Sequence, residues 1–427
     1  MKWFNKVIQI FKIKDLRKKI FFVLLVLVIF RVAANIPVPG IDTEQLKQFF
    51  ANNQLFGLLN IFTGGAMSNL SIVMLGLGPF ITATIIMQLL TMIFPQLEAL
   101  YKEEGERGRQ KFNQYSRLLT VPLAGLQSYA MLTLLSRQNI ISSLSSMQWL
   151  TSIVVITAGA LFLMWLGELI SEKGIGNGVS LLIFAGIVSA VPLSIREIAV
   201  TYDPSKIPSY LAFLALALVI TTGVVIITEG RRNIPVSYAK RVRGHRIYGG
   251  VSTYLPLNIN PAGVIPIIFA LSIMLFPGMV ANFLGTSSIG WLASFAQIVG
   301  RLFENAWFYG TAYFALVVLF TYFYTAVTFD PKNVANNLQK MGGFIPGIRP
   351  GRPTSDFLYF ILNRVLLFGA IFLGTIAVLP SVVQGATGIT AFGFAIGGTA
   401  LLIIVSVVLE MMRQIGSQLT MRDYEGF

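Results

Sequence analysis

The sequence contains no cysteine and only one histidine, His245. A chain without cysteine has neither a disulfide nor a thiolate nucleophile, and one histidine does not build a metal site. Charged side chains are also scarce, at 12% of the residues, and only 18 of them are acidic against 32 basic ones. The net charge of +14 therefore favours anionic lipid or acidic partners.

Long hydrophobic runs dominate the sequence instead. Hydrophobic residues make up 55% of the chain, and its mean hydropathy is +0.73. Repeated apolar runs of about 20 residues are typical of polytopic membrane proteins, because a helix of that length crosses the bilayer core. We predict an all-α membrane protein with ten transmembrane helices, over residues 20–37, 74–95, 116–136, 150–170, 177–195, 209–229, 261–282, 307–328, 361–380 and 391–411.

The positions of lysine and arginine predict the orientation. If the N-terminus is cytoplasmic, 26 of the 32 basic residues fall on the cytoplasmic side and 6 on the other. This bias predicts that both termini are cytoplasmic. Five spans, a polar link over 196–208 and five more spans are compatible with two inverted halves, 1–195 and 209–427.

Three connections are long, polar and basic: 96–115, 230–260 and 329–360. In the second of these, strand-like pieces flank Arg243-Gly244, so we expect a protruding hairpin.

The stretch from Ile61 to Pro95 carries no charge but is too long for one span. As a single helix it would extend about 52 Å, against a bilayer core of about 30 Å. Gly76, Gly78 and Pro79 fall together and predict a break. We therefore expect a short re-entrant helix over 64–73. The other spans should enclose it, because irregular backbone at membrane depth is tolerated only inside protein or beside water.

Ionisable residues are almost absent from the predicted spans. Arg31 lies near the outer end of the first span and Glu168 near the cytoplasmic end of the fourth, where each side chain can extend to the interface. The lack of charges near the midplane argues against ion-coupled transport of charged substrates and against intramembrane proteolysis. Ten spans and a broken helix nevertheless leave an inverted-repeat secondary transporter of a small solute as the alternative.

The second span carries a mixed face at helical spacing, formed by Leu77, Ile81, Thr84, Gln88 and Thr91. Its polar members lie toward the cytoplasm, where Gln127 and Ser272 of other spans can join them. Two interpretations stay open. These side chains hold the bundle together by hydrogen bonds, or they line a seam that separates, because such bonds contribute only about 0.6 kcal/mol each in a bilayer.

The two longest basic connections also have two interpretations. Their cations include Lys240, Arg241, Arg243, Arg246, Arg349 and Arg352. These charges set the topology beside anionic lipid, or they dock an acidic or nucleic-acid partner. Both segments are longer than anchoring requires, and their glycine and proline content indicates fixed shapes, so both interpretations stay open.

Motifs along nearly the whole chain resemble those of the SecY family, the channel subunits of the bacterial protein translocase. They are Arg31-Val-Ala-Ala-Asn-Ile-Pro-Val-Pro-Gly40, Gly64-Gly-Ala-Met-Ser, Gly78-Pro-Phe-Ile-Thr-Ala, Glu104-Gly-Glu-Arg-Gly-Arg109, Gly174-Ile-Gly-Asn-Gly178, Tyr238-Ala-Lys-Arg, Tyr254-Leu-Pro-Leu, Asn260-Pro-Ala-Gly-Val-Ile-Pro266, Gly347-Ile-Arg-Pro-Gly351 and Gly397-Gly-Thr-Ala-Leu-Leu-Ile403.

The resemblance implies a central hourglass pore with a plug on its outer side. The plug residues are Gly64, Gly65, Ala66, Met67, Ser68, Asn69, Leu70 and Ser71. The narrow pore ring is implied at Leu77, Ile81, Val179, Ile183, Ile268 and Ile403. Leu77 and Val179 stand where some members have isoleucine, and Asn69 replaces a basic or polar residue.

The resemblance also implies a lateral gate between spans two and three and spans seven and eight. Its polar residues here are Thr84, Gln88, Gln127 and Ser272. The docking residues for the SecA motor or the ribosome are Lys240, Arg241, Arg243, Arg246, Arg349 and Arg352.

The function implied is a protein-conducting channel of the bacterial cytoplasmic membrane and not an enzyme. It would move unfolded preproteins across the membrane and release apolar segments sideways into the bilayer. The expected partners are SecE, SecG, the SecA motor ATPase, the ribosome and signal sequences. We expect no cofactor and no direct DNA binding.

Overall fold

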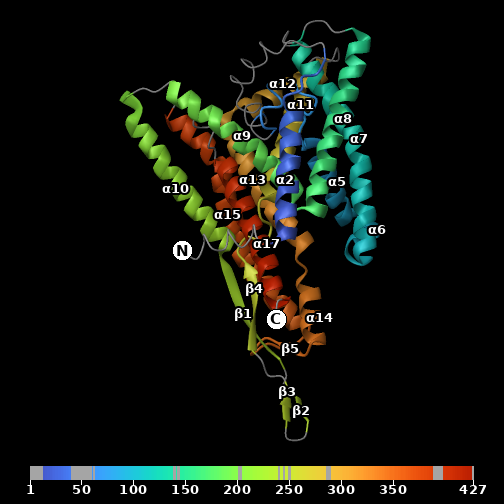
Figure 1. Cartoon of the computed structure of the whole chain (residues 1–427), viewed down its shortest axis with the longest axis vertical. Coiled ribbons are helices and arrows are strands. Elements are labelled where there is room, and N and C mark those ends of the chain that lie inside the picture. The colour runs from blue at the N-terminus through green and yellow to red at the C-terminus, as the bar shows by residue number, and fades with distance from the viewer. Residues whose placement is uncertain are drawn as a thin grey trace.

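The computed structural model describes residues 13–39, 60, 63–137, 141, 145–200, 204–238, 241–243, 246–248, 252–284, 290–387 and 398–425. Figure 1 shows a bundle of long helices with a small β-structure extending from one end. Lys240, Gly244 and the first part of the predicted tenth span, 391–397, lie outside the described residues.

A helix occupies each of the ten predicted spans. These helices are α2 (Lys14–Ala33), α5 (Gly78–Ile93), α7 (Gly105–Arg137), α8 (Ser146–Lys173), α9 (Gly178–Val200), α10 (Ile207–Glu229), α11 (Ile265–Leu284), α13 (Ala306–Thr328), α15 (Arg352–Thr387) and α17 (Gly398–Glu425). Within the described residues, six helices are long and apolar enough to cross a membrane alone. A bent pair formed by α5 and α6 (Pro95–Lys102) can supply a seventh span. The predicted all-α polytopic fold is confirmed.

Local sequence explains where several of these helices begin. Ser145 caps α8, because its Oγ accepts a hydrogen bond from Gln148 N at 3.3 Å while Gln148 Oε1 accepts one from Ser145 N at 2.9 Å. Asn305 caps α13 through its side-chain oxygen. Pro79 and Pro95 occupy the first turns of α5 and α6, where the missing N–H costs nothing.

The polar segment 96–115 is more helical than the sequence suggested. It contains most of α6 and the first turns of α7, which meet at a bend after Lys102. Lys102 and Glu98 form an ion pair at 3.0 Å along α6, and the rings of Tyr101 and Phe112 join the two helices at 4.9 Å. The polar segment thus extends the helical structure of α6 and α7 beyond the apolar part of the bundle.

Contacts between the helices divide them into two groups. In the first half, α2, α5, α7, α8 and α9 contact one another, and in the second half α10, α11, α13, α15 and α17 do the same. The two groups meet where α11 contacts α5 and α7, and where α17 contacts α9. The surface between α11 and the α5–α7 pair is the one on which the predicted seam lies.

Two further helices complete the second half. The amphipathic α12 (Gly290–Glu304) packs on α11 and α13, and α14 (Pro331–Lys340) packs on α15. A short 3₁₀ helix, Pro204–Lys206, precedes α10. Figure 1 shows α12 at the end of the bundle opposite to α14.

The basic connections form the β-structure. Strands β1 (Arg231–Tyr238) and β4 (Ser252–Asn258) pair antiparallel, and β5 (Gly343–Phe344) adds to the other edge of β1. Between β1 and β4, β2 (Arg241–Arg243) and β3 (Arg246–Tyr248) form the outermost hairpin. The predicted hairpin is confirmed, and one sheet joins the two basic connections (Figure 1).

Two ion pairs join neighbouring helices. Arg117 Nε of α7 donates to Glu168 Oε1 of α8 at 2.6 Å, and Arg413 of α17 pairs with Glu229 of α10 at 2.7 Å. From the sequence, Glu168 can extend to the interface, and in the structure it also has a cationic partner from a neighbouring helix.

Candidate functional site

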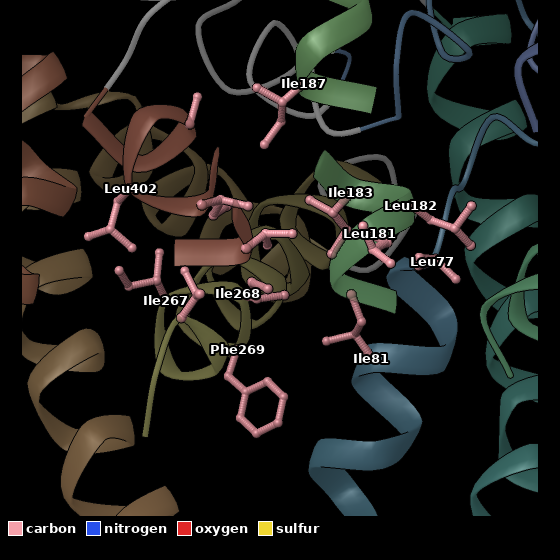
Figure 2. Close-up of a cluster of buried hydrophobic side chains, with 14 of the residues drawn as sticks. Leu77, Ile81, Leu181, Leu182, Ile183, Ile187, Ile267, Ile268, Phe269 and Leu402 are labelled. Atoms are coloured by element: carbon pink, nitrogen blue, oxygen red, sulfur yellow. The ribbon is translucent and has the colours of Figure 1, made fainter. Parts of the chain in front are cut away.

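The six aliphatic residues singled out in the sequence lie in one hydrophobic cluster. Five of them are buried in it, and Val179 packs against it partly buried. They come from four helices: Leu77 and Ile81 at the start of α5, Val179 and Ile183 on α9, Ile268 on α11 and Ile403 on α17. Figure 2 shows Ile81, Ile183 and Ile268 in this cluster, each on a different helix.

The beginnings of these helices bring the six side chains together. Each residue lies at the N-cap or within the first two turns of its helix. The turns in front contain glycines in the left-handed region, such as Gly76, with φ of 58°, before α5 and Gly176, with φ of 92°, before α9. The conformation of these turns therefore sets where the aliphatic side chains enter the cluster.

Ile187 is a further buried aliphatic residue of α9 in the same cluster, and it was not among the six residues named from the sequence. It lies one helical turn beyond Ile183 and is fully buried. The spacing of four residues from Val179 to Ile183 to Ile187 places all three on one face of the helix. Figure 2 places Ile187 at the edge of the cluster, above Ile183.

The 64–73 segment lies inside the bundle, as predicted. Ala66 and Val73 belong to the cluster of the six aliphatic residues, whereas Met67 and Leu70 pack in a second cluster with residues of α7 and α8. None of these four side chains is more than 2% exposed. The segment thus fills the space between the two clusters.

The predicted helical conformation of this segment is wrong. The described residues from Thr63 to Leu70 form successive turns, and Ser71 makes an isolated β-bridge with Pro37. Gly64, Gly65 and Leu70 have φ values of 67°, 82° and 42°, which no α-helix contains. Contacts with residues after α2 and the two adjacent glycines favour these turns over a helix.

The break before α5 is confirmed. Gly76 has a positive φ, and a Cβ at that position would lie 3.0 Å from Thr63 Cγ2. The turn ends at Gly78, where α5 begins. Glycine is therefore required at Gly76 both for its conformation and for the close contact.

Gly159 of α8 allows the 64–73 segment to approach that helix closely. A Cβ built on Gly159 would lie 1.9 Å from the carbonyl oxygen of Ile72. The backbone of the segment thus rests directly on the backbone of α8, without an intervening side chain.

The Arg31 side chain, which from the sequence can extend to the outer interface, points into the protein instead. Its Nη1 donates hydrogen bonds to the carbonyl oxygen of Gly64 and to Ser189 Oγ of α9, the second at 3.2 Å. Sequence reasoning singled out Arg31 as an ionisable residue within a span but did not identify these partners.

The four polar residues of the predicted seam do not bond to one another in the structure. The hydroxyls of Thr84 and Ser272 each donate to a carbonyl oxygen of their own helix, at 2.9 Å. Gln88 Oε1 is buried without a hydrogen-bond partner in the described residues. Gln127 Oε1 faces Gly78, 3.9 Å from the position of a Cβ there. The interpretation in which these side chains hold the bundle together by mutual hydrogen bonds is not the arrangement observed.

The basic residues of the two connections lie on the β-structure and beside it. Arg241, Arg243 and Arg246 belong to the β2–β3 hairpin, in which Arg243 pairs with Arg246. Arg349 is exposed in the turn before α15 and Arg352 is exposed at the first position of that helix. Thr354 Oγ1 of α15 donates to the Arg349 carbonyl oxygen at 2.9 Å.

An apolar core fixes this region to the bundle. It combines residues of β1, β4, α14 and α15 and the turn after β5: Ile234, Val236, Leu257, Leu338, Ile345, Leu358 and Ile361. The shared core and sheet hold the two basic connections in one defined arrangement.

Curated relatives match nearly the whole chain. The SecY family model matches residues 71–412. The chain is 44% identical to a protein translocase subunit SecY of Corynebacterium glutamicum, over 99% of both chains. It is also 44% identical to a SecY subunit of Streptomyces scabiei, over 98% of both chains.

Solved structures share the fold at lower sequence identity. A protein-conducting channel aligns with a TM-score of 0.64 at 20% identity, over 92% of this chain and 90% of that one. A SecY structure whose plug domain stabilises the closed state and maintains a membrane seal aligns with a TM-score of 0.63 at 20% identity, with the same coverage. Sec61 from the canine ribosome–channel complex of the endoplasmic reticulum gives a TM-score of 0.60 at 20% identity, again with that coverage.

The matches cover nearly the whole chain. They agree with the structure, which has ten helices in this order, a buried turn segment before α5 and two connections that carry a sheet. The chain belongs to the SecY family.

Proposed function

We propose that this chain is the channel through which unfolded preproteins cross the bacterial cytoplasmic membrane. The observation that carries the proposal is the meeting of six aliphatic side chains from four helices beside a buried turn segment. Helices from both halves contribute, so separation of the halves would open a path at this point. Among the residues that the structure describes, nothing in the arrangement favours a small-solute site over a passage for a polypeptide.

In this proposal the six aliphatic residues form the pore ring. Their side chains offer neither donors nor acceptors to an ion, and a narrow apolar constriction closes by dewetting. Aliphatic side chains also adapt to a passing chain of any sequence, because they form no directional bonds. The ring thus serves as a seal around the translocating polypeptide.

The 64–73 segment is the plug in this proposal. Its apolar side chains pack on the ring cluster on one side and on α7 and α8 on the other. In the SecY structure named above, a plug domain stabilises the closed state of the channel and maintains the membrane seal. The turn at Gly76 supplies the hinge about which the segment leaves the pore.

The surface between α11 and the α5–α7 pair is the lateral gate in this proposal. Thr84 and Ser272 satisfy their hydroxyls within their own helices, so opening the gate breaks neither of these two hydrogen bonds. An apolar segment of the substrate can then leave sideways by partition, which favours the bilayer by about 0.3–0.6 kcal/mol per strongly apolar residue.

The end of the bundle that carries the sheet faces the cytoplasm in this proposal, with both termini on that side. Its exposed arginines dock the SecA motor or the ribosome, and SecE and SecG complete the channel. The chain supplies no energy of its own, so a partner ATPase or the translating ribosome must drive transport. Sec61, similar in fold, forms a channel complex with a ribosome.

Membrane vesicles holding this chain with its partner subunits test the proposal. With the motor and ATP, a preprotein should become protected from added protease, which requires passage into the lumen. Uptake of a small solute driven by its own gradient, without any preprotein protection, would instead support the alternative of a secondary transporter.

The same vesicles test the docking role of Arg349. We expect Arg349→Glu to reduce motor-driven preprotein protection about tenfold or more, because an exposed cation in a contact with an acidic surface becomes a repulsive charge. The amount of inserted channel should not change, since Arg349 is solvent-exposed. Arg301→Glu on α12, also exposed, is the matched control and should retain protection. Equal protection in both variants would remove Arg349 from the docking surface.

A further inference from the structure

The outer end of α2 and the residues after it run alongside the plug. We call residues 31–38 the anchoring segment. Its contacts with the plug extend from Gly64 to Ile72: Arg31 Nη1 to Gly64 O, Asn69 Nδ2 to Asn35 Oδ1 at 3.4 Å, Val38 N to Leu70 O at 2.8 Å, and Ile72 N to Ile36 O at 2.9 Å. Most of these bonds tie the last residues of the plug, and the Arg31 bond ties the first.

Arg31 differs from the other residues of the anchoring segment because it also binds α9. The same Nη1 that donates to Gly64 O donates to Ser189 Oγ at 3.2 Å, and this hydroxyl donates onward to Gly186 O of α9 at 2.7 Å. Gly64 itself lies against α9, since a Cβ there would be 3.0 Å from Gly186 Cα. One cationic side chain thus joins the start of the plug to both α2 and α9.

The Gly64 carbonyl needs this donor only while the plug is in place. Gly64 is buried, with φ of 67°, and within the described part of the chain no backbone N–H bonds to its carbonyl oxygen. A hydrogen bond from a charged donor is stronger than one between neutral groups, and a buried carbonyl left without a donor is unfavourable. Outside its seat the same carbonyl is satisfied by water. The Arg31 bond therefore stabilises the closed arrangement relative to the open one.

We propose that Arg31 is a positioning residue that holds the plug in its closed seat, by bonding Gly64 of the plug and Ser189 of α9 at the same time. This inference rests on the proposed function, in which the 64–73 segment is the plug. It assigns to an arginine in the first span a role in closing the channel rather than in anchoring the helix at the membrane surface.

The first measurement is the ion conductance of the resting complex in a planar bilayer. Arg31→Ala should raise the conductance about tenfold or more, a factor that corresponds to about 1.4 kcal/mol. Arg31→Lys keeps the charge and a donor and should restore part of the seal. Arg301→Ala, which removes an exposed arginine of α12, is the control and should conduct like the parent.

A reversible disulfide bridge between the anchoring segment and the plug distinguishes a leak caused by plug displacement from a leak caused by general damage to the channel. Pro37 and Ser71 face each other in an antiparallel β-bridge, and the bonds from Val38 N to Leu70 O and from Ile72 N to Ile36 O make them a non-hydrogen-bonded pair. The Cα atoms of such pairs lie about 4.5 Å apart, within the range that a disulfide spans. Because the chain has no cysteine, Pro37→Cys with Ser71→Cys introduces the only two thiols.

The bridge should abolish the leak of Arg31→Ala. With both cysteines present, oxidation is expected to return the conductance to that of the parent, and reductant should restore the leak. An unchanged conductance in Arg31→Ala would overturn the inference. A leak that persists with the bridge formed would overturn it too, because the plug would then be in place while the channel conducts.

The bridge also distinguishes this inference from the proposed function. In the chain with Arg31 intact, the oxidised bridge should block preprotein protection in vesicles, and reductant should restore it. If the bridge blocks transport but Arg31→Ala does not leak, only the role of Arg31 fails. If the bridge forms and transport continues, the assignment of the 64–73 segment as the plug fails.

Discussion

Replacing Ile183 with asparagine is expected to make the resting channel conduct ions. Ile183 is 5% exposed within the aliphatic cluster of the proposed pore ring. An amide there gives water two donors and an acceptor where the parent offers none. A buried amide without hydrogen-bond partners costs about 1–3 kcal/mol. The water-filled state of the constriction should therefore be stabilised by a similar free energy relative to its dry state.

That stabilisation corresponds to an increase of about fivefold to 150-fold in the hydrated population, and conductance in a planar bilayer should rise by a similar factor. Ile226→Asn is the matched control, since Ile226 is 62% exposed on the face of α10. It makes the same chemical change away from the cluster and should leave conductance unchanged. Equal conductance in the two variants would mean that Ile183 does not line a constriction.

Replacing Gly178 with alanine is expected to prevent correct packing of α8 and α9. A Cβ at Gly178 would lie 1.8 Å from the carbonyl oxygen of Gly167 and 2.9 Å from Ile170 Cβ. Both of these atoms belong to α8, so the two helices must move apart to make room for the Cβ. The Gly178 N–H also donates to Ser171 Oγ at 2.9 Å, and that bond would lengthen.

Overpacking typically costs about 1–3 kcal/mol, and a clash with backbone that cannot rotate away lies at the upper end of that range. This cost exceeds the gain of about 1 kcal/mol that alanine brings to a helix. We expect a lower thermal denaturation midpoint of the detergent-solubilised protein and less of it in the membrane. Gly125→Ala on α7 is the matched control, because the nearest atom to a Cβ there is Thr157 Oγ1 at 4.0 Å. A midpoint for Gly178→Ala equal to that control would show that α8 and α9 do not approach as closely as the structure indicates.

Local sequence features predicted most of the fold. Apolar runs placed a helix at each of the ten positions, because membrane thickness fixes the length of a span. The break before α5 followed from Gly76 to Pro79, and the hairpin followed from strand-like pieces around Arg243. Each of these features depends on residues close together in the sequence.

Features that depend on distant residues were missed. The 64–73 segment adopts turns because Ser71 pairs with Pro37 and because Gly159 of α8 admits its backbone. Arg31 points inward because its acceptor, the Gly64 carbonyl, lies 33 residues further along the chain. Hydropathy contains no information about either contact.

The proposed pore ring was identified from family motifs and not from periodicity. Its six members share their cluster with many other buried aliphatic residues, such as Leu181 and Leu182 of α9. Burial and spacing do not distinguish a residue that faces a pore from one that packs against a neighbouring helix. The distinction requires a test with a polypeptide in the channel.

Crosslinking from single cysteines to a stalled preprotein is that test. The chain has no cysteine, so Ile81→Cys and Ile268→Cys each introduce one thiol, on α5 of the first half and α11 of the second. Ile226→Cys and Leu214→Cys, both on exposed positions of α10, are the controls. The preprotein carries a thiol-reactive group in its middle and a folded domain that halts it during transport.

The proposed function predicts crosslinks from both Ile81→Cys and Ile268→Cys, only when the motor and ATP are present, and none from the controls. Crosslinks from the controls alone, or none at either ring position while the preprotein is stalled, would contradict the path of the polypeptide through this cluster.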